Sequence, residues 1–188
     1  AHTTFNVVCT LLWLPLLGVM VKIVTFLVPG KEEEHGPGAL VTLDENILGQ
    51  PVFAIRMFGE ELQKFCDKVG SMLETLPGAV ASRDAAALKA LQGDCAQVEA
   101  AEVELANYAV ELLSAGATSE RQAAEITDLM SIVDAVGRIG SRCGEVAGLY
   151  GENLASKKPF SDEAREELAE SAAMVSEMYD AVLRFLSD

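Results

Sequence analysis

Histidine is scarce and cysteine is scattered in this sequence of 188 residues, which argues against a metal centre. His35 lies in a charged stretch, with no other histidine or cysteine near it in the sequence. Zinc sites need clustered thiolates and imidazoles, and disulfide frameworks need paired thiols. We therefore expect no metal, no cofactor and reduced thiols. The four cysteines share no C-x-x-C spacing: Cys9, Cys66, Cys95 and Cys143.

Basic residues are also few. Lys and Arg together number 14 against 29 Asp and Glu, so the formal net charge is −15. Binding to nucleic-acid phosphates requires Lys and Arg that displace counterions, so no nucleic-acid partner is predicted. We interpret the excess of acid as solvated helix faces, with binding of divalent cations as the alternative.

Familiar catalytic motifs are missing as well. The sequence has no phosphate-cradling glycine loop, no G-x-S-x-G and no H-E-x-x-H. General acid–base catalysis needs a carboxylate whose pKa is shifted by burial, and no sequence feature indicates one. The sequence therefore predicts a protein that is not an enzyme.

If the acidic residues do bind a cation, the site should lie between two facing helices, as in di-metal bundles. Carboxylates of one predicted helix would then face carboxylates of the next. Solvated helix faces are the commoner role for such residues. The candidates are Asp94, Glu99 and Glu102 on one helix and Asp128, Asp134 and Glu145 on the other.

Charge is almost absent from residues 1–30, which contain Lys22 and no acid. The apolar run 5–28 has 24 residues, and a helix crosses a bilayer with about 20. Lys22 is close enough to the end of the run to reach the headgroups. We therefore predict one transmembrane helix within 1–30. Its characteristic residues are Phe5, Asn6, Trp13, Pro15, Lys22 and Phe26.

Three alternatives fit this segment less well. A cleaved signal peptide would have a basic start and a shorter apolar core, and a buried core helix would also be shorter. A simple anchor would need neither Asn6 nor Pro15. Lys22 and Lys31 flank the end of the run, which favours a cytoplasmic side for the residues that follow. Because the chain begins at Ala1 without Met, we expect a longer parent protein.

Residues 31–50 are predicted to form a charged linker broken by Gly36-Pro37-Gly38. Residues 51–188 then show four apolar stripes with spacings of three and four, which indicate long amphipathic helices. The sequence predicts that the first helix starts at Pro51 and ends at Pro77-Gly78, and that the second closes at Gly116. The stripe of the last helix is Leu168, Ala172, Val175, Tyr179, Val182 and Leu186.

The last two helices carry start signals and a group of glycines. Ser119 and Gln122 have the spacing of a capping box, and Ser161 is placed to cap the final helix. Gly137, Gly140 and Gly144 each cost about 1 kcal/mol of helix stability, so we expect a close backbone approach there. The predicted fold is all-α: a transmembrane helix followed by an antiparallel bundle of four long helices.

These residues resemble a known family. Residues 1–16, with His2, Phe5, Asn6 and Pro15, resemble the last transmembrane segment of bacterial sodium/phosphate cotransporters. The stretch LDENILGQPVFA resembles the junction that follows it. The rest is similar to the PhoU-like C-terminal domain of that family, notably at 160–164 and around Arg138-Ile139-Gly140.

The chain departs from that family in two respects. Where PhoU-like domains often read Glu-Arg-Ile-Gly-Asp, this chain has Gly137, Arg138, Ile139, Gly140 and Ser141. Both acids that can ligate a metal are replaced, so metal binding is not carried over. The family's transport core, with its Gln-Ser-Ser repeats, is absent from these residues and is expected upstream.

The resemblance implies the C-terminal portion of a transporter that moves inorganic phosphate together with sodium. The bundle would be a regulatory or interaction domain on the cytoplasmic side of the bacterial inner membrane. Its expected partners are the upstream transmembrane core, the lipid bilayer and a second copy in a homodimer. The alternatives are a membrane-anchored helical signalling or adaptor module and a PhoU-like regulator of phosphate uptake.

Overall fold

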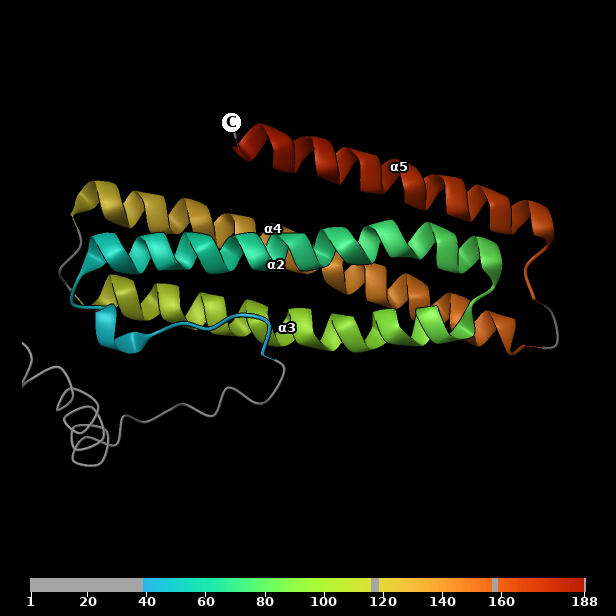
Figure 1. The fold of residues 1–188 in the computed structure, drawn as a ribbon, viewed down its shortest axis with the longest axis horizontal. Helices are drawn as coiled ribbons and strands as arrows, with labels where there is room; N and C mark the ends of the chain where they lie inside the picture. Colours follow the sequence, from blue (N-terminus) through green and yellow to red (C-terminus); the bar gives the residue numbers. More distant parts are fainter. Residues whose placement is uncertain (1–38, 116–118, 157–158, 188) are drawn as a thin grey trace, which may run out of the picture. The chain divides into compact units, whose positions relative to one another are not determined.

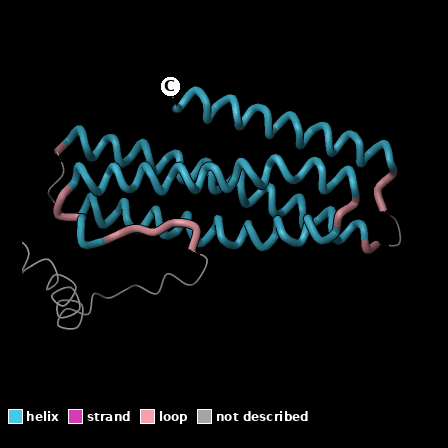
Figure 2. The backbone as a smooth tube through the Cα atoms, in the orientation of Figure 1, coloured by secondary structure: helices cyan, strands magenta, loops and turns pink. Residues whose placement is uncertain are grey.

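The computed structural model describes residues 39–115, 119–156 and 159–187, which belong to one compact unit. Four long helices make up most of it, as predicted: α2 (Pro51–Ser82), α3 (Ala85–Ser114), α4 (Glu120–Leu154) and α5 (Asp162–Ser187). Successive helices run in opposite directions (Figures 1 and 2). Within the described ranges, no helix is both long and apolar enough to cross a bilayer. The predicted transmembrane segment lies outside these ranges.

Helix α2 begins at Pro51 as predicted but does not end at Pro77-Gly78. Pro77 lies inside the helix, which continues to Ser82 and is closed by Arg83 in a left-handed conformation. An internal proline costs about 3 kcal/mol because it removes a backbone hydrogen bond. Beyond it, Ala79 and Val80 are buried in the core. The burial of this last turn offsets the cost of Pro77. The helix therefore continues past the proline at which the local sequence predicts its end.

The other helix starts are fixed by side-chain caps. Asp84 accepts hydrogen bonds from the backbone amides of residues 86 and 87 at the start of α3. Ser119 and Gln122 form the predicted capping box of α4. Ser161 Oγ accepts the amide hydrogen of Ala164 at 3.1 Å, which confirms the predicted cap of α5. These bonds satisfy amides that have no partner within the helix.

Helices α2, α3 and α4 form the central core, with α4 packed on both others. A Cβ atom added at Gly140 would lie 2.8 Å from Val98 Cγ1 and 3.1 Å from Val69 Cγ2. One added at Gly137 or Gly144 would overlap the side chain of Glu102 or Cys95. The predicted close approach is therefore confirmed, and the neighbour on the glycine face is mainly α3.

The stripe of helix α5 is less buried than predicted. It packs along α2, whereas α4 packs along α2 and α3. Of its predicted stripe, Tyr179 is buried, but Val175 and Val182 are 47% and 57% exposed. The predicted bundle of four long helices is therefore present in the described part of the chain, as a three-helix core with α5 packed on α2.

The second half of the expected linker belongs to the folded unit. Val41 and Leu43 are buried, and Glu45–Ile47 form a short 3-10 helix, η1. Glu61, itself 6% exposed, accepts the amide hydrogen of Thr42 at 3.0 Å and is paired with Lys64 at 2.6 Å. This contact fixes the stretch 39–44 on α2, so these residues are not the solvated linker that we expected, and residues 31–38 of that linker lie outside the described ranges.

Candidate functional site

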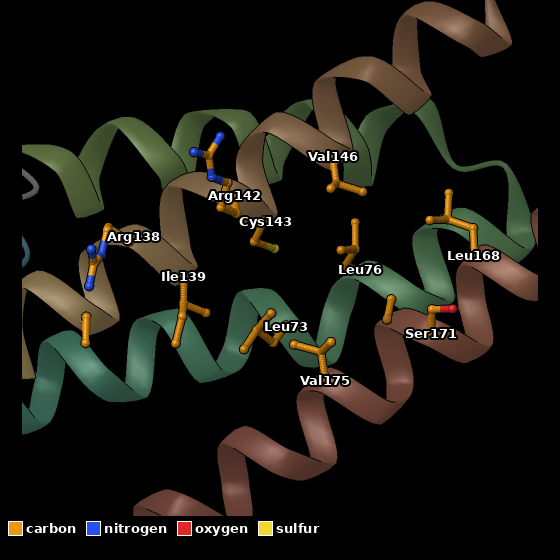
Figure 3. A pocket seen from close by; sticks show the side chains of 12 residues that line it. Leu73, Leu76, Arg138, Ile139, Arg142, Cys143, Val146, Leu168, Ser171 and Val175 are labelled. Carbon is orange, nitrogen blue, oxygen red and sulfur yellow. The ribbon is translucent and has the colours of Figure 1, made fainter.

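An apolar groove opens where α4 and α5 diverge over α2 (Figure 3). Its volume is about 530 Å³. Leu73 and Leu76 of α2 form its floor, and Ile139 and Val146 of α4 point into the same space. Helix α5 supplies the remaining wall. The α5 residues that line the groove are Leu168, Ser171, Ala172 and Val175.

The groove exists because of how α5 is attached to α2. Tyr179 Oη donates a hydrogen bond of 2.8 Å to the backbone oxygen of Cys66. The ring of Tyr179 lies over Gly70, where an added Cβ would be 3.3 Å from the ring edge. Glycine thus lets the tyrosine approach the α2 backbone. This contact holds the C-terminal half of α5 on α2. The side of α5 that faces away from α2 is left uncovered.

Two arginines of α4 lie at the edge of the groove. Both residues line the groove, and their side chains are largely exposed to solvent (Figure 3). Arg138 pairs with Asp134 at 3.1 Å, and Arg142 pairs with Glu145 at 2.6 Å. Both pairs are exposed, and exposed ion pairs contribute little to stability. A guanidinium has five donors, so each arginine can bind a further anionic group.

The thiol on the groove wall is not set up as a nucleophile. Burial, followed by the charges of nearby Cys95 and Asp94, raises the pKa of Cys143 to about 11. The pKa of Cys95 is also raised to about 11, first by burial and then by Glu99. Because the thiolate is the reactive form, both groups are protonated at neutral pH. The groove therefore offers apolar contact rather than covalent chemistry.

The structure brings together only some of the acidic candidates. Glu102 of α3 lies against Gly137, and its pKa is raised by burial, then by Asp134 and Glu99, with Arg138 acting in the opposite direction. Asp94 instead pairs with Lys68, Glu145 pairs with Arg142, and Asp128 is exposed on α4. Within the described ranges, no three potential ligands are grouped so that they could hold a metal ion.

The five residues 137–141 of α4 lie on two different faces of that helix. Gly137 and Gly140 are buried against α3. Arg138 and Ile139 line the groove, and the backbone oxygen of Ser141 accepts a long contact of 3.9 Å from Cys95 Sγ. These residues thus link the tight helix contact to the groove wall. The residues expected to characterise a transmembrane helix lie outside the described ranges: Phe5, Asn6, Trp13, Pro15, Lys22 and Phe26.

The groove was not predicted from the sequence. Its signal is a second apolar stripe on α5, formed by Leu168, Val175, Met178 and Val182. Leu168, Val175 and Val182 were assigned to one predicted stripe together with Tyr179, which packs on α2, and Met178 was not included. Two stripes on one helix indicate two partners. The burial of Glu61 was not predicted either, because two adjacent glutamates on a helix normally indicate a solvent-exposed face.

Comparison with known protein families, with curated proteins and with solved structures finds no match to this chain.

Proposed function

We propose that this chain is the C-terminal part of a sodium-dependent phosphate transporter and that residues 39–188 are its non-catalytic interaction domain. The observation that supports a binding role is the apolar groove, lined by Leu73, Ile139 and Val146 and edged by two arginines. Burying an apolar surface there is favourable by about 25 cal/mol per Å². The transport assignment is supported by the family resemblance of residues 1–30 and of the motifs that follow.

In this proposal, sodium entering down its gradient drives phosphate uptake through a transmembrane core upstream of Ala1. Residues 1–30 cross the bacterial inner membrane and pack on that core. The helical domain lies on the cytoplasmic side and regulates transport through the partner that occupies its groove. Acidic surfaces repel phosphate and anionic lipid, so the domain itself is not the phosphate-binding part.

The direct test is phosphate uptake by the parent protein, produced in bacterial cells that lack other phosphate transporters. We expect uptake of labelled phosphate with sodium in the medium and little uptake when potassium replaces it. Uptake that is absent, or equal in both media, would contradict the transport assignment. Absent uptake from a parent with an initiator Met shortly before Ala1 would favour the anchored adaptor instead.

The role of the groove is tested by a matched pair of charge insertions. Val146→Glu places a carboxylate in the apolar lining, whereas Val103→Glu places one at an exposed position of α3. We expect the first change to alter the sodium-dependent uptake rate and the second to leave it unchanged. Equal rates for both variants, with equal amounts in the membrane, would remove the groove from the proposal.

A further inference from the structure

Helix α5 carries two mainly apolar stripes; within the described residues one is covered by α2, whereas most of the other is exposed. The seam on α2 has spacings of 3-4-3-4 and contains Ala169, Ala172, Ser176, Tyr179 and Leu183. The second stripe has the same spacing and contains Leu168, Ser171, Val175, Met178 and Val182. Met178 is 69% exposed, and Met174 beside this stripe is also exposed. A helix with two such seams is built to lie between two neighbours.

The exposed stripe and the groove belong to one surface. Leu168, Ser171 and Val175 line the groove, and Met178 and Val182 continue the same stripe toward the C-terminal end of α5. The surface therefore has an apolar hollow at one end and an apolar ridge at the other. A two-fold axis would place the ridge of each copy in the hollow of the other, which is the self-complementarity of an isologous interface.

We propose that a second copy of this chain covers this surface, with the exposed stripe of each α5 seated in the groove between α4 and α5 of its partner. This inference rests on the proposed function, because it names the partner of the groove that the interaction domain uses.

Charge supports a second α5 as the occupant. The groove edge carries Arg138 and Arg142, while α5 has seven acids and two arginines. Glu170 and Glu177 directly precede Ser171 and Met178 of the exposed stripe, so they flank it on one side. Carboxylates so placed can meet guanidinium groups across the interface in charge-assisted hydrogen bonds. Complementary charge of this kind fixes the register of a helix pair.

Other occupants fit less well. Residues 1–30 of the same chain are apolar but contain no acid that could meet the arginines. A free amphiphile with an anionic headgroup could reach the arginines, but it would leave Met178 and Val182 uncovered. A second α5 covers the groove and the ridge together, which the other two occupants do not.

Site-specific photo-cross-linking of the full chain in the membranes of producing cells tests this pairing. Two copies with different tags are produced together, one with benzoylphenylalanine at position 178. We expect a product that carries both tags, joined to the peptide containing residues 138–146 of the other copy. The same photoreactive residue at position 103, where Val103 of α3 is 61% exposed against 69% for Met178, should give no such product.

The contrary outcomes are distinct. A product within residues 1–38, an adduct with lipid, or no product with both tags would each overturn the pairing. A product that joins α5 to a different surface of the second copy would also overturn it, because the groove would then not be the binding site of the second α5.

Charge exchange tests the register independently. Arg138→Glu with Arg142→Glu should lower the yield of the doubly tagged product about ten-fold, because rim charges control encounter and register. Glu170→Arg with Glu177→Arg in the other copy should restore it. Circular dichroism and the melting temperature verify that both variants are folded. Folded variants with an unchanged yield, or with no restoration, would overturn the charge pairing and with it this orientation of α5.

Failure of the pairing can be told from failure of the proposed function. If the cross-link is absent while Val146→Glu still alters sodium-dependent uptake, the groove has a partner other than a second copy. If the cross-link forms but uptake does not depend on sodium, the pairing holds and the transport assignment fails.

Discussion

The contact between α3 and α4 and the contact between α2 and α5 use glycine in different ways. Along α4, successive glycines let the whole face approach the side chains of α3. Along α2, Gly70 admits a single tyrosine of α5. The first arrangement produces a continuous core, and the second produces one anchor point beside an open groove. The same type of residue thus supports a rigid interface in one place and a binding surface in the other.

The difference shows how a helical domain can be firmly folded and still keep a binding face. Most of the fully buried side chains belong to α2, α3 and α4. Helix α5 contributes one buried aromatic and otherwise half-buried or exposed apolar residues. Regions with few buried contacts open at lower free energy than the core, and binding surfaces are drawn from them.

The largest effect is expected from removing the same side chain in the two regions. Leu105→Ala, in the α3 core, should lower the free energy of unfolding by about 3 kcal/mol, because it leaves a cavity. Leu183→Ala, on the half-buried seam of α5, should cost about 1 kcal/mol, because water can fill the site. Urea unfolding followed by circular dichroism measures both. An equal loss of unfolding free energy in both variants would mean that α5 is packed as tightly as the core helices.

Glycine substitutions sharpen the same comparison. Gly140→Leu should cost about 2 kcal/mol, because its side chain must displace Val98 and Val69. Gly93→Ala is the control, since an added Cβ there meets nothing within 4 Å. It should stabilise α3 by up to about 1 kcal/mol through helix propensity. If the melting temperature rises in both variants, the close approach at Gly140 is refuted.

Loss of the anchor should loosen α5 alone. Tyr179→Phe removes the hydrogen bond to the backbone oxygen of Cys66 and should cost about 1 kcal/mol. Hydrogen exchange should become faster in α5 and stay unchanged in α3 and α4. The control is Tyr108→Phe, whose hydroxyl donates a longer bond of 3.4 Å to Asp44 O and has no contact with α5. Faster exchange throughout the chain would show that α5 is part of the central core.

The smallest effect concerns Glu102, the half-buried acid at the contact between α3 and α4. The pKa of Glu102 is raised in the folded state, so folding disfavours its charged form. This destabilisation is present at neutral pH and disappears as the pH falls below the unfolded value of about 4.5. Glu102→Gln should therefore add a few tenths of a kcal/mol at pH 7 and nothing near pH 4. A gain that persists at pH 4 would point to packing rather than charge.

Much of the helical framework could be predicted from local patterns. Caps and stripes depend on residues within a few positions of each other, so Pro51, Ser119 and Ser161 were placed correctly. Pro77 was not, because the burial that carries α2 past it comes from distant helices. The groove was not predicted either, since the stripe of α5 was read as one seam although its residues divide between two.

The sequence by itself determined that the described part of the chain is made of long amphipathic helices and that the glycines of α4 need a close neighbour. Spacing and the missing Cβ atoms impose those features on any fold the chain adopts. The tertiary structure alone decided which helix each stripe meets and that α5 covers α2 but leaves α4 open. That choice depends on how side chains far apart in the sequence fit together, as Tyr179 fits over Gly70, and periodicity carries no information about such a fit.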